Sequence, residues 1–187
     1  MNLTTRIRAV NRIFALADAH TAKFRAASGL RCLDNCGLCC TNPNIRATVL
    51  EFLPLAQHLV VSDTHISVYE RLISQNDTVC VNYNPFESAG HCTAYQNRGL
   101  ICRMFGFTAR TNQHGKPELV TCNLIKKSIP QEKIDKTLIK APVMADYYMK
   151  LYGIDPNLSV QYLPVNESVK KALEIVLLES QFRKKRA

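Results

Sequence analysis

The chain has 187 residues, of which 47% are hydrophobic, so it is long enough for one ordinary domain with a buried core of its own. The composition excludes collagen-like and low-complexity proteins, and eight cysteines are not needed to staple so large a scaffold. The formal charge of +9 would suit a nucleic-acid partner, but eight thiolates holding two doubly charged ions or clusters would reduce it to +5. Charge alone therefore identifies no partner.

The N-terminal segment carries no sign of a secretory signal. Arg6, Arg8 and Arg12 interrupt its apolar residues, so no continuous apolar stretch forms there. No run in the chain approaches the ~18 apolar residues needed to span a bilayer. We therefore expect a cytoplasmic protein with no membrane partner. Because structural disulfides are rare in reducing cytosol, a cluster of cysteines there favours metal binding.

The first third of the chain is predicted to be helical on both sides of a cysteine-rich loop. Apolar residues at helical spacing predict an amphipathic helix over residues 4–27, and the cysteine-rich segment 31–44 then forms a loop. A second helical pattern covers residues 48–61, where Pro54 predicts a kink or boundary. A short helix is expected next, with Asp63 as its N-cap and its end near Ser74.

A β-hairpin is predicted in the second half of the chain, after an irregular segment. Residues 104–110 and 118–123 flank the turn sequence 112–115, whose residues favour a tight reversal. Folding about this turn is expected to bring Cys102 and Cys122 into the same neighbourhood.

Two helices are predicted at the C-terminal end, over residues 130–152 and 167–182. We expect a single domain over residues 1–187, with a cysteine-cluster core over residues 31–122. The predicted fold is mainly α with one short β-hairpin, its helices packed around a loop-rich cysteine centre.

The cysteines are confined to the middle of the chain, which scattered packing residues would not be. The segment Cys36-Gly37-Leu38-Cys39-Cys40 suits a tight turn that aims two sulfurs at one metal, with Gly37 free to adopt a positive φ. Side chains of adjacent residues diverge, so one of Cys39 and Cys40 is expected to join Cys36 and the other to serve a second site or a bridge. The candidate metal ligands are Cys32, Cys36, Cys39, Cys40, Cys80, Cys92, Cys102 and Cys122.

Two arginines accompany the later cysteines. Arg98 and Arg103 are placed to offset thiolate charge and to donate hydrogen bonds towards a bound cofactor. Tyr95 and Phe105 are expected to shield the site from water.

The motifs Cys32-x3-Cys36-Gly37-x-Cys39-Cys40 and Cys92-x2-Tyr95-x2-Arg98-x3-Cys102-Arg103-x-Phe105 resemble those of the YkgJ-type cysteine-cluster family, whose signature is CxxCxxCC. The resemblance covers residues 31–122 and implies chelation of zinc or iron. The sequence departs from the family pattern at the first spacing, which is x3 rather than x2, and at Gly99, where many relatives have proline.

The leading hypothesis is a metal-binding protein with a structural or electron-transfer centre. All-cysteine ligation suits Zn2+ and an iron–sulfur cluster alike, in two four-sulfur sites or in one site with spare cysteines. We favour iron–sulfur because the ligands do not form two tidy zinc pairs. A redox partner protein would then be expected.

Two alternatives stay open, a metal-dependent enzyme with an open coordination position and a zinc-stabilised nucleic-acid-binding module. No phosphate-binding loop, dinucleotide fingerprint or nucleophile elbow is present in the sequence, so we name no catalytic residue.

Overall fold

The computed structural model describes residues 1–34, 36–74, 79–87 and 91–184, and helices dominate this part of the chain. The prediction of a mainly helical protein with a short hairpin is confirmed. The α-helices are α1 (Leu3–Ser28), α2 (Leu53–Val61), α3 (His65–Ser74), α4 (Leu100–Met104), α5 (Asn123–Lys126), α6 (Gln131–Leu138), α7 (Met144–Tyr152), α8 (Pro156–Ser159) and α9 (Val165–Lys184). The strands are β1 (Arg46–Thr48), β2 (Thr108–Thr111), β3 (Pro117–Val120) and β4 (Tyr162–Pro164). No helix in the described ranges is both long and apolar enough to cross a membrane.

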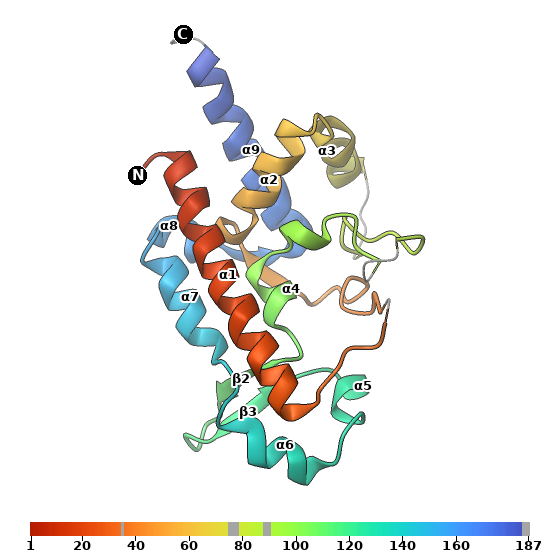
Figure 1. The fold of residues 1–187 in the computed structure, drawn as a ribbon. Helices are drawn as coiled ribbons and strands as arrows, with labels where there is room; N and C mark the ends of the chain where they lie inside the picture. Colours follow the sequence, from red (N-terminus) through yellow and green to blue (C-terminus); the bar gives the residue numbers. More distant parts are fainter. Residues whose placement is uncertain (35, 75–78, 88–90, 185–187) are drawn as a thin grey trace.

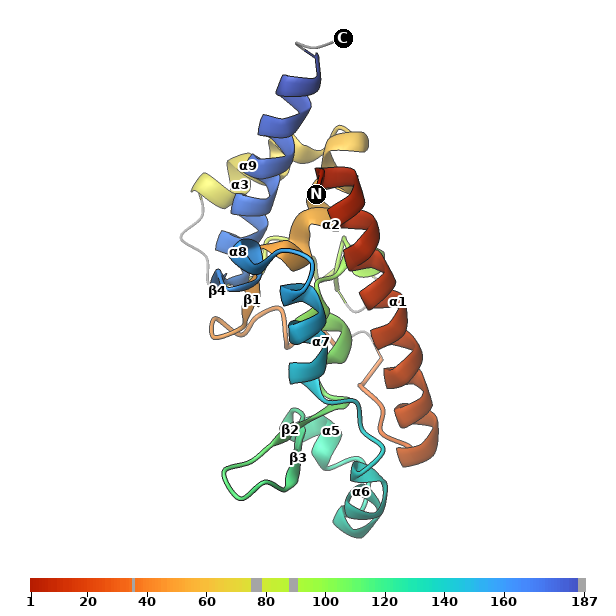
Figure 2. The ribbon, with the colours of Figure 1, turned by 90° about the vertical axis from the view of Figure 1, so that its left-hand side faces the viewer.

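Helix α1 runs along most of the length of the molecule (Figures 1 and 2). It contacts α2 near one end of the molecule, α4 and α7 at the centre, and α6 near the other end. It starts where the side chain of Asn2 accepts a hydrogen bond of 2.9 Å from the backbone N–H of Thr5. It ends at Gly29, whose φ of 75° is left-handed and whose N–H donates to the carbonyl of Arg25. The helix predicted over residues 4–27 is confirmed.

The major core lies in the upper half of Figure 1, where α1 and α2 pack with α9. Helices α4 and α7 close it from the centre of the molecule. Its fully buried side chains include Val10, Leu53, Leu55, Leu100, Met104, Leu151 and Leu173. Cys92 belongs to this core and Cys80 packs against it.

The minor core lies at the other end of α1, between that helix, the hairpin β2–β3, α5 and α6. It consists of Phe24, Leu30, Phe107, Ala109, Ile125, Ile134 and Ala141. Cys32 and Cys122 pack against it. Cys32 and Cys122 are thus anchored on the minor core, whereas Cys80 and Cys92 are anchored on the major core.

The hairpin is confirmed, with β2 and β3 antiparallel and Thr108 opposite Val120. The N–H of Gly106 extends the pairing by donating to the carbonyl of Val120 at 3.0 Å. Cys102 precedes the hairpin within α4, and Cys122 follows it as the N-cap of α5.

The single helix predicted over residues 130–152 is wrong, because the chain forms α6 and α7 with a break between them. Pro142 lies in the break and has no N–H with which to continue a helix. Its carbonyl instead accepts hydrogen bonds from the N–H of Ala109 at 2.8 Å and the hydroxyl of Thr108 at 2.6 Å. The break therefore ties the start of α7 to the hairpin. The last predicted helix is present as α9.

The segment predicted as helix over residues 48–61 begins differently. Residues Arg46–Thr48 form β1, which pairs with β4 from the far end of the chain, and α2 starts with Pro54 in its first turn. Asp63 is not an N-cap, since it has a φ of 56° and follows the end of α2, before α3 begins at His65.

The burial of Phe24 predicts that Phe24→Ala loosens the minor core. The ring is 1% exposed, so its removal is expected to lower the free energy of unfolding by about 3–5 kcal/mol. Leu16→Ala on the same helix is the control, because Leu16 is 38% exposed and its loss should cost roughly 0.5 kcal/mol. Urea titration of both variants measures the difference, and equal midpoints would contradict the assignment of Phe24 to a core.

Candidate metal centre

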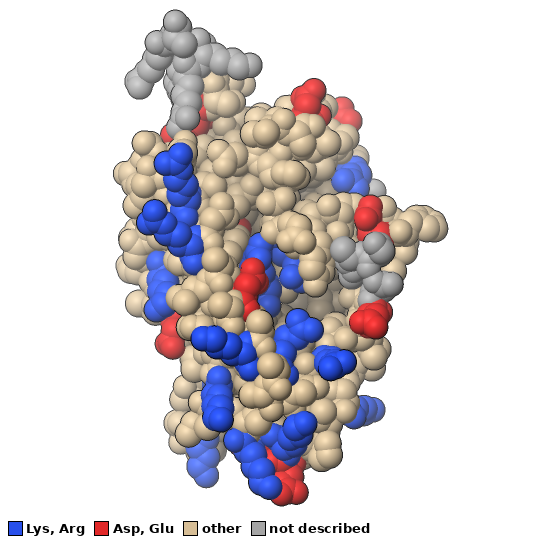
Figure 3. Space-filling model, in the orientation of Figure 1, with Lys and Arg blue, Asp and Glu red and all other residues tan. Residues whose placement is uncertain are grey.

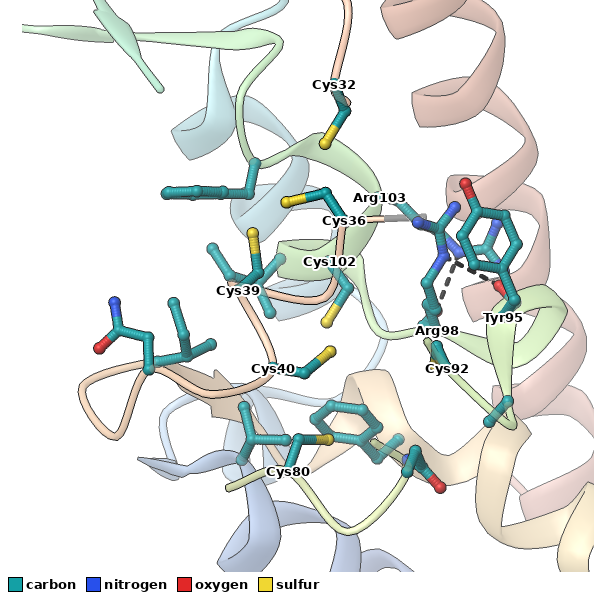
Figure 4. Close-up of a pocket in the computed structure, with 18 of the residues that line it drawn as sticks. Cys32, Cys36, Cys39, Cys40, Cys80, Cys92, Tyr95, Arg98, Cys102 and Arg103 are labelled. Carbon is teal, nitrogen blue, oxygen red and sulfur yellow. Dashed lines mark hydrogen bonds between the residues drawn. The ribbon is translucent and has the colours of Figure 1, made fainter. Parts of the chain in front are cut away.

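Seven of the eight cysteines line one cavity of about 940 Å³, between α1, α4 and the loop of residues 32–45 (Figure 4). Cys122 is the eighth, and it lies beside this cavity in the minor core rather than in its lining. All eight are free thiols. The fold therefore gathers residues that are up to 90 positions apart, from Cys32 to Cys122, around one space.

One group of four thiols, here called the outer set, consists of Cys32, Cys36, Cys39 and Cys122. Burial raises the pKa of Cys32, and the neighbouring Cys36 and Cys122 raise it further. Burial also raises the pKa of Cys39 to about 12, with contributions from Cys32, Cys40, Cys122 and Cys36. Cys39 is an exposed residue whose sulfur points towards Cys36 in Figure 4. These influences indicate that Cys32, Cys36 and Cys122 lie in the neighbourhood of Cys39, as Cys40 of the next set also does.

The other group, the inner set, consists of Cys40, Cys80, Cys92 and Cys102. The pKa of Cys40 is raised chiefly by its hydrogen bond with the thiol of Cys80, and then by burial. Burial is the main cause of the raised pKa of Cys92 and of Cys102, and Cys40 raises both further. The backbone reinforces the set, since the N–H of Cys80 donates to the carbonyl of Cys40 at 2.8 Å.

Adjacent Cys39 and Cys40 divide between the two sets. In Figure 4 the sulfur of Cys39 lies on the side of Cys32 and Cys36, whereas that of Cys40 lies between those of Cys102 and Cys80. This is the arrangement in which one of the two neighbours joins Cys36 and the other serves a second site. Cys102 and Cys122, expected in one neighbourhood, fall into different sets.

The loop that presents Cys36, Cys39 and Cys40 is a series of short turns. The N–H of Cys36 donates to the carbonyl of Leu33, and the N–H of Cys40 donates to that of Gly37 at 2.9 Å. Gly37 does not adopt the positive φ that was predicted for it. It is required for space instead, because a Cβ at this position would lie 2.5 Å from the ring of Tyr83.

The donor atoms fit a thiophilic metal. Four cysteines in each set match the ligand number of tetrahedral zinc and of iron–sulfur clusters. Among the described residues no three His, Cys, Asp or Glu side chains already stand close enough together to hold an ion. Thiols with raised pKa values repel one another as anions, and a bound cation would reverse that repulsion and draw them together.

Arg98 lies beside the inner set. The sequence predicts that this arginine offsets thiolate charge. Its positive charge lowers the pKa of Cys40, Cys92 and Cys102, against the larger effects that raise them. The guanidinium lies 3.6 Å from the ring centre of Tyr95 and its Nε donates to the Tyr95 carbonyl at 2.9 Å. The partly exposed Tyr95 thus holds Arg98 in place at the edge of the cavity.

Arg103 lines the cavity and also holds the loop before α4 in place. Its guanidinium donates to the carboxylate of Asp18 on α1 and to the carbonyls of Gln96 and Arg98. It also lies over the ring of Phe14, 4.7 Å from the ring centre. Arg103 therefore fastens the loop before α4, and with it Arg98, to α1.

Glu51 is a buried carboxylate that supports the site from outside the cavity lining. It is completely buried, and burial raises the pKa of its carboxyl. One oxygen accepts the N–H of Thr48 at 2.6 Å and its hydroxyl at 3.0 Å, and the other accepts the N–H of Ile101 at 2.9 Å. Glu51 therefore caps the N-terminal turn of α4, the helix that carries Cys102. The sequence does not show which N–H groups an isolated Glu would cap.

Comparison with known protein families gives one result. The family model CxxCxxCC, described as "Putative zinc- or iron-chelating domain", matches residues 31–129, slightly more than half of the chain. The matched segment contains all eight cysteines together with Arg98 and Arg103. No curated protein and no solved structure matches the chain.

The contacts of Glu51 predict that Glu51→Ala destabilises the fold around α4. The change leaves the N–H groups of Thr48 and Ile101 buried without acceptors, at about 1–3 kcal/mol each. Chemical denaturation should show this loss, and Glu70→Ala on the exposed side of α3 should stay within roughly 0.5 kcal/mol of the parent protein. A Glu51→Ala protein as stable as the Glu70→Ala control would show that Glu51 does not support the helix.

Proposed function

We propose, since this chain belongs to the CxxCxxCC family, that it is a cytoplasmic electron-transfer protein with two iron–sulfur centres. The outer set would hold one centre and the inner set the other. The observation that carries the proposal is the different placement of two adjacent cysteines at a cavity that seven cysteines line: the sulfur of Cys39 lies beside Cys36, whereas that of Cys40 lies with Cys80 and Cys102.

The size of the cavity favours clusters over single zinc ions. A structural zinc site closes around its ion, with sulfurs about 2.3 Å from the metal, and leaves no room beside it. The cavity of about 940 Å³ is at the upper end of the ~300–1,000 Å³ that ligand pockets span. Seven cysteines line it. A space of this size suits polynuclear clusters, whose inorganic atoms add volume beyond that of one ion.

Electron transfer is favoured over the alternative of a metal-dependent enzyme. An open coordination position needs three protein ligands at a centre, whereas each set here offers four thiols. When bound, iron–sulfur clusters supply one-electron redox chemistry. The protein would hold them, exclude water from the inner set through Cys92 and its apolar surroundings, and set the charge near them through Arg98.

The two-centre proposal predicts the metal content of single cysteine variants. Protein purified without oxygen should contain iron with matching acid-labile sulfide and absorb broadly near ~400 nm. Cys122→Ser in the outer set and Cys80→Ser in the inner set should each remove about half of the iron, because the other four sulfurs stay in place. Iron, sulfide and protein are quantified on the same samples.

The double variant Cys80→Ser/Cys122→Ser is the matched control and should retain almost no iron. Colourless parent protein with zinc would contradict the iron–sulfur assignment. Complete loss of iron from each single variant would contradict two separate centres.

The position of Arg98 predicts its effect on redox potential. Arg98→Met removes a positive charge beside the inner set, which disfavours the more negative reduced state, so the midpoint potential of one centre should fall. A loss of about 1.4 kcal/mol corresponds to roughly 60 mV for one electron. Potentiometric titration measures the shift, with Lys171→Met on the exposed side of α9 as the control. A potential equal to that of the control would rule out a role for Arg98 in tuning the centre.

A further inference from the structure

The positive charge of the molecule is concentrated around the minor core. Residues 106–141 contain seven lysines and arginines against three acidic residues, a net charge of +4. Residues 41–105 contain three of the four inner cysteines, and they carry four basic and five acidic residues, a net charge of −1. The segment around the minor core is therefore positively charged, whereas the segment that holds most of the inner set is close to neutral.

Six exposed basic side chains form what is here called the basic surface: Lys23, Arg25, Arg31, Lys126, Lys127 and Lys133. In the part of the chain that the structure describes, none of the six forms an ion pair. Figure 3 shows lysines and arginines gathered on the lower half of the molecule, where α1, α5 and α6 meet. Their charges are thus available to a partner.

Contacts tie this surface to the outer set. Lys126 donates its backbone N–H to the carbonyl of Cys122 at 3.0 Å, and Arg31 directly precedes Cys32. Lys133 of α6 reaches the end of α1, with its Nζ 3.0 Å from the position that a Cβ on Gly29 would take. Basic residues from three elements therefore lie around the minor core, against which Cys32 and Cys122 pack.

Three exposed leucines stand beside the same cysteines. Leu33 follows Cys32 and is 59% exposed, and Leu38 precedes Cys39 and is also 59% exposed. Leu124, two residues after Cys122, is 41% exposed. An apolar centre within a charged rim is the usual composition of a protein–protein interface. Single-stranded nucleic acid would instead be expected to stack on exposed aromatic rings, and among the described residues of 19–34 and 106–141 no Phe, Tyr or Trp is exposed.

The outer set is also the more accessible of the two. Cys39 is exposed, whereas the inner set contains buried Cys92 and lies behind Arg98 and Tyr95. Electrons exchanged with another protein would reach the outer set first.

We infer that the basic surface and its three leucines are the docking site for an acidic redox protein that exchanges electrons with the centre of the outer set. This inference rests on the proposed function. One electron passes between a reduced and an oxidised centre, and no bond forms or breaks. Complementary charge accelerates such an encounter and makes it sensitive to salt.

The experiment uses reduced plant-type ferredoxin as the acidic probe and the radical cation of methyl viologen as the positively charged one. Stopped-flow reduction of the loaded protein is compared with that of Lys126→Glu/Lys127→Glu, of Leu124→Ser, and of Lys150→Glu/Lys171→Glu as a control away from the surface. Titration calorimetry with oxidised ferredoxin gives the affinity of the same variants independently of electron transfer.

Reduction by ferredoxin at low salt should slow about tenfold in Lys126→Glu/Lys127→Glu, and its affinity should fall in parallel. Leu124→Ser should weaken binding without changing the salt dependence. The control should change less than about twofold, and the viologen cation should reduce the reversed variant no more slowly than the parent.

Equal ferredoxin rates and affinities in all variants, with full iron content, would overturn this inference and leave the two iron–sulfur centres intact. Zinc-loaded protein that no probe reduces would overturn the proposed function, and this inference with it. Salt-dependent binding of single-stranded RNA that the reversed variant loses, with unchanged ferredoxin rates, would assign the surface to nucleic acid instead.

Discussion

The arrangement of the site depends on one peptide bond, the one between Cys39 and Cys40. The two side chains leave neighbouring positions in different directions, so their sulfurs cannot belong to one compact group without distorting the loop. The chain resolves this by offering three further thiols on each side. Those partners are fixed on different cores, Cys32 and Cys122 on the minor core and Cys80 and Cys92 on the major core. Metal bound to the two sets would clamp both cores to the same short loop, so binding and folding should be coupled.

Electrostatics account for the residues that surround the cysteines. Eight thiols at close quarters resist ionisation, as the raised pKa values of Cys32, Cys39, Cys40, Cys92 and Cys102 show. The structure supplies one positive charge directly to the inner set through Arg98, and Arg103 holds the loop that carries it. Glu51 works in the opposite sense on Cys102, whose pKa it raises, but its hydrogen bonds fix the helix on which Cys102 lies. Two charged residues therefore act on the inner set: Arg98 favours the thiolates, and buried Glu51 disfavours them but stabilises α4.

Much of this could be predicted from local sequence. The helical spacing of apolar residues, with Gly29 after them, was sufficient for α1, and the residues 112–115 were sufficient for the hairpin. The break between α6 and α7 carried a local signal in Pro142, which cannot continue a helix, and the prediction overlooked it. The hydrogen bonds to Thr108 and Ala109 that hold the break come from more than 30 residues away and could not be predicted. The pairing of β1 with β4 was missed for the same reason.

The candidate site shows the same limit. The spacing of the cysteines identified all eight as candidates and predicted the divergence of Cys39 and Cys40. It could not assign the other six to the outer or the inner set, because that assignment depends on the core against which each cysteine packs. Gly37 shows that a correctly chosen residue can have another physical role, since it leaves room for Tyr83. Arg103, at the cavity as expected, also fastens a loop to α1. The partners of Glu51 could not be predicted, since a buried cap is defined by the groups it contacts in space.

Anomalous diffraction from crystals of anaerobically purified protein, collected above and below the iron edge, tests the account most directly. Two separate iron positions are predicted, one among Cys32, Cys36, Cys39 and Cys122 and the other among Cys40, Cys80, Cys92 and Cys102. A single iron position, or anomalous signal at the zinc edge alone, would contradict the assignment of two iron–sulfur centres.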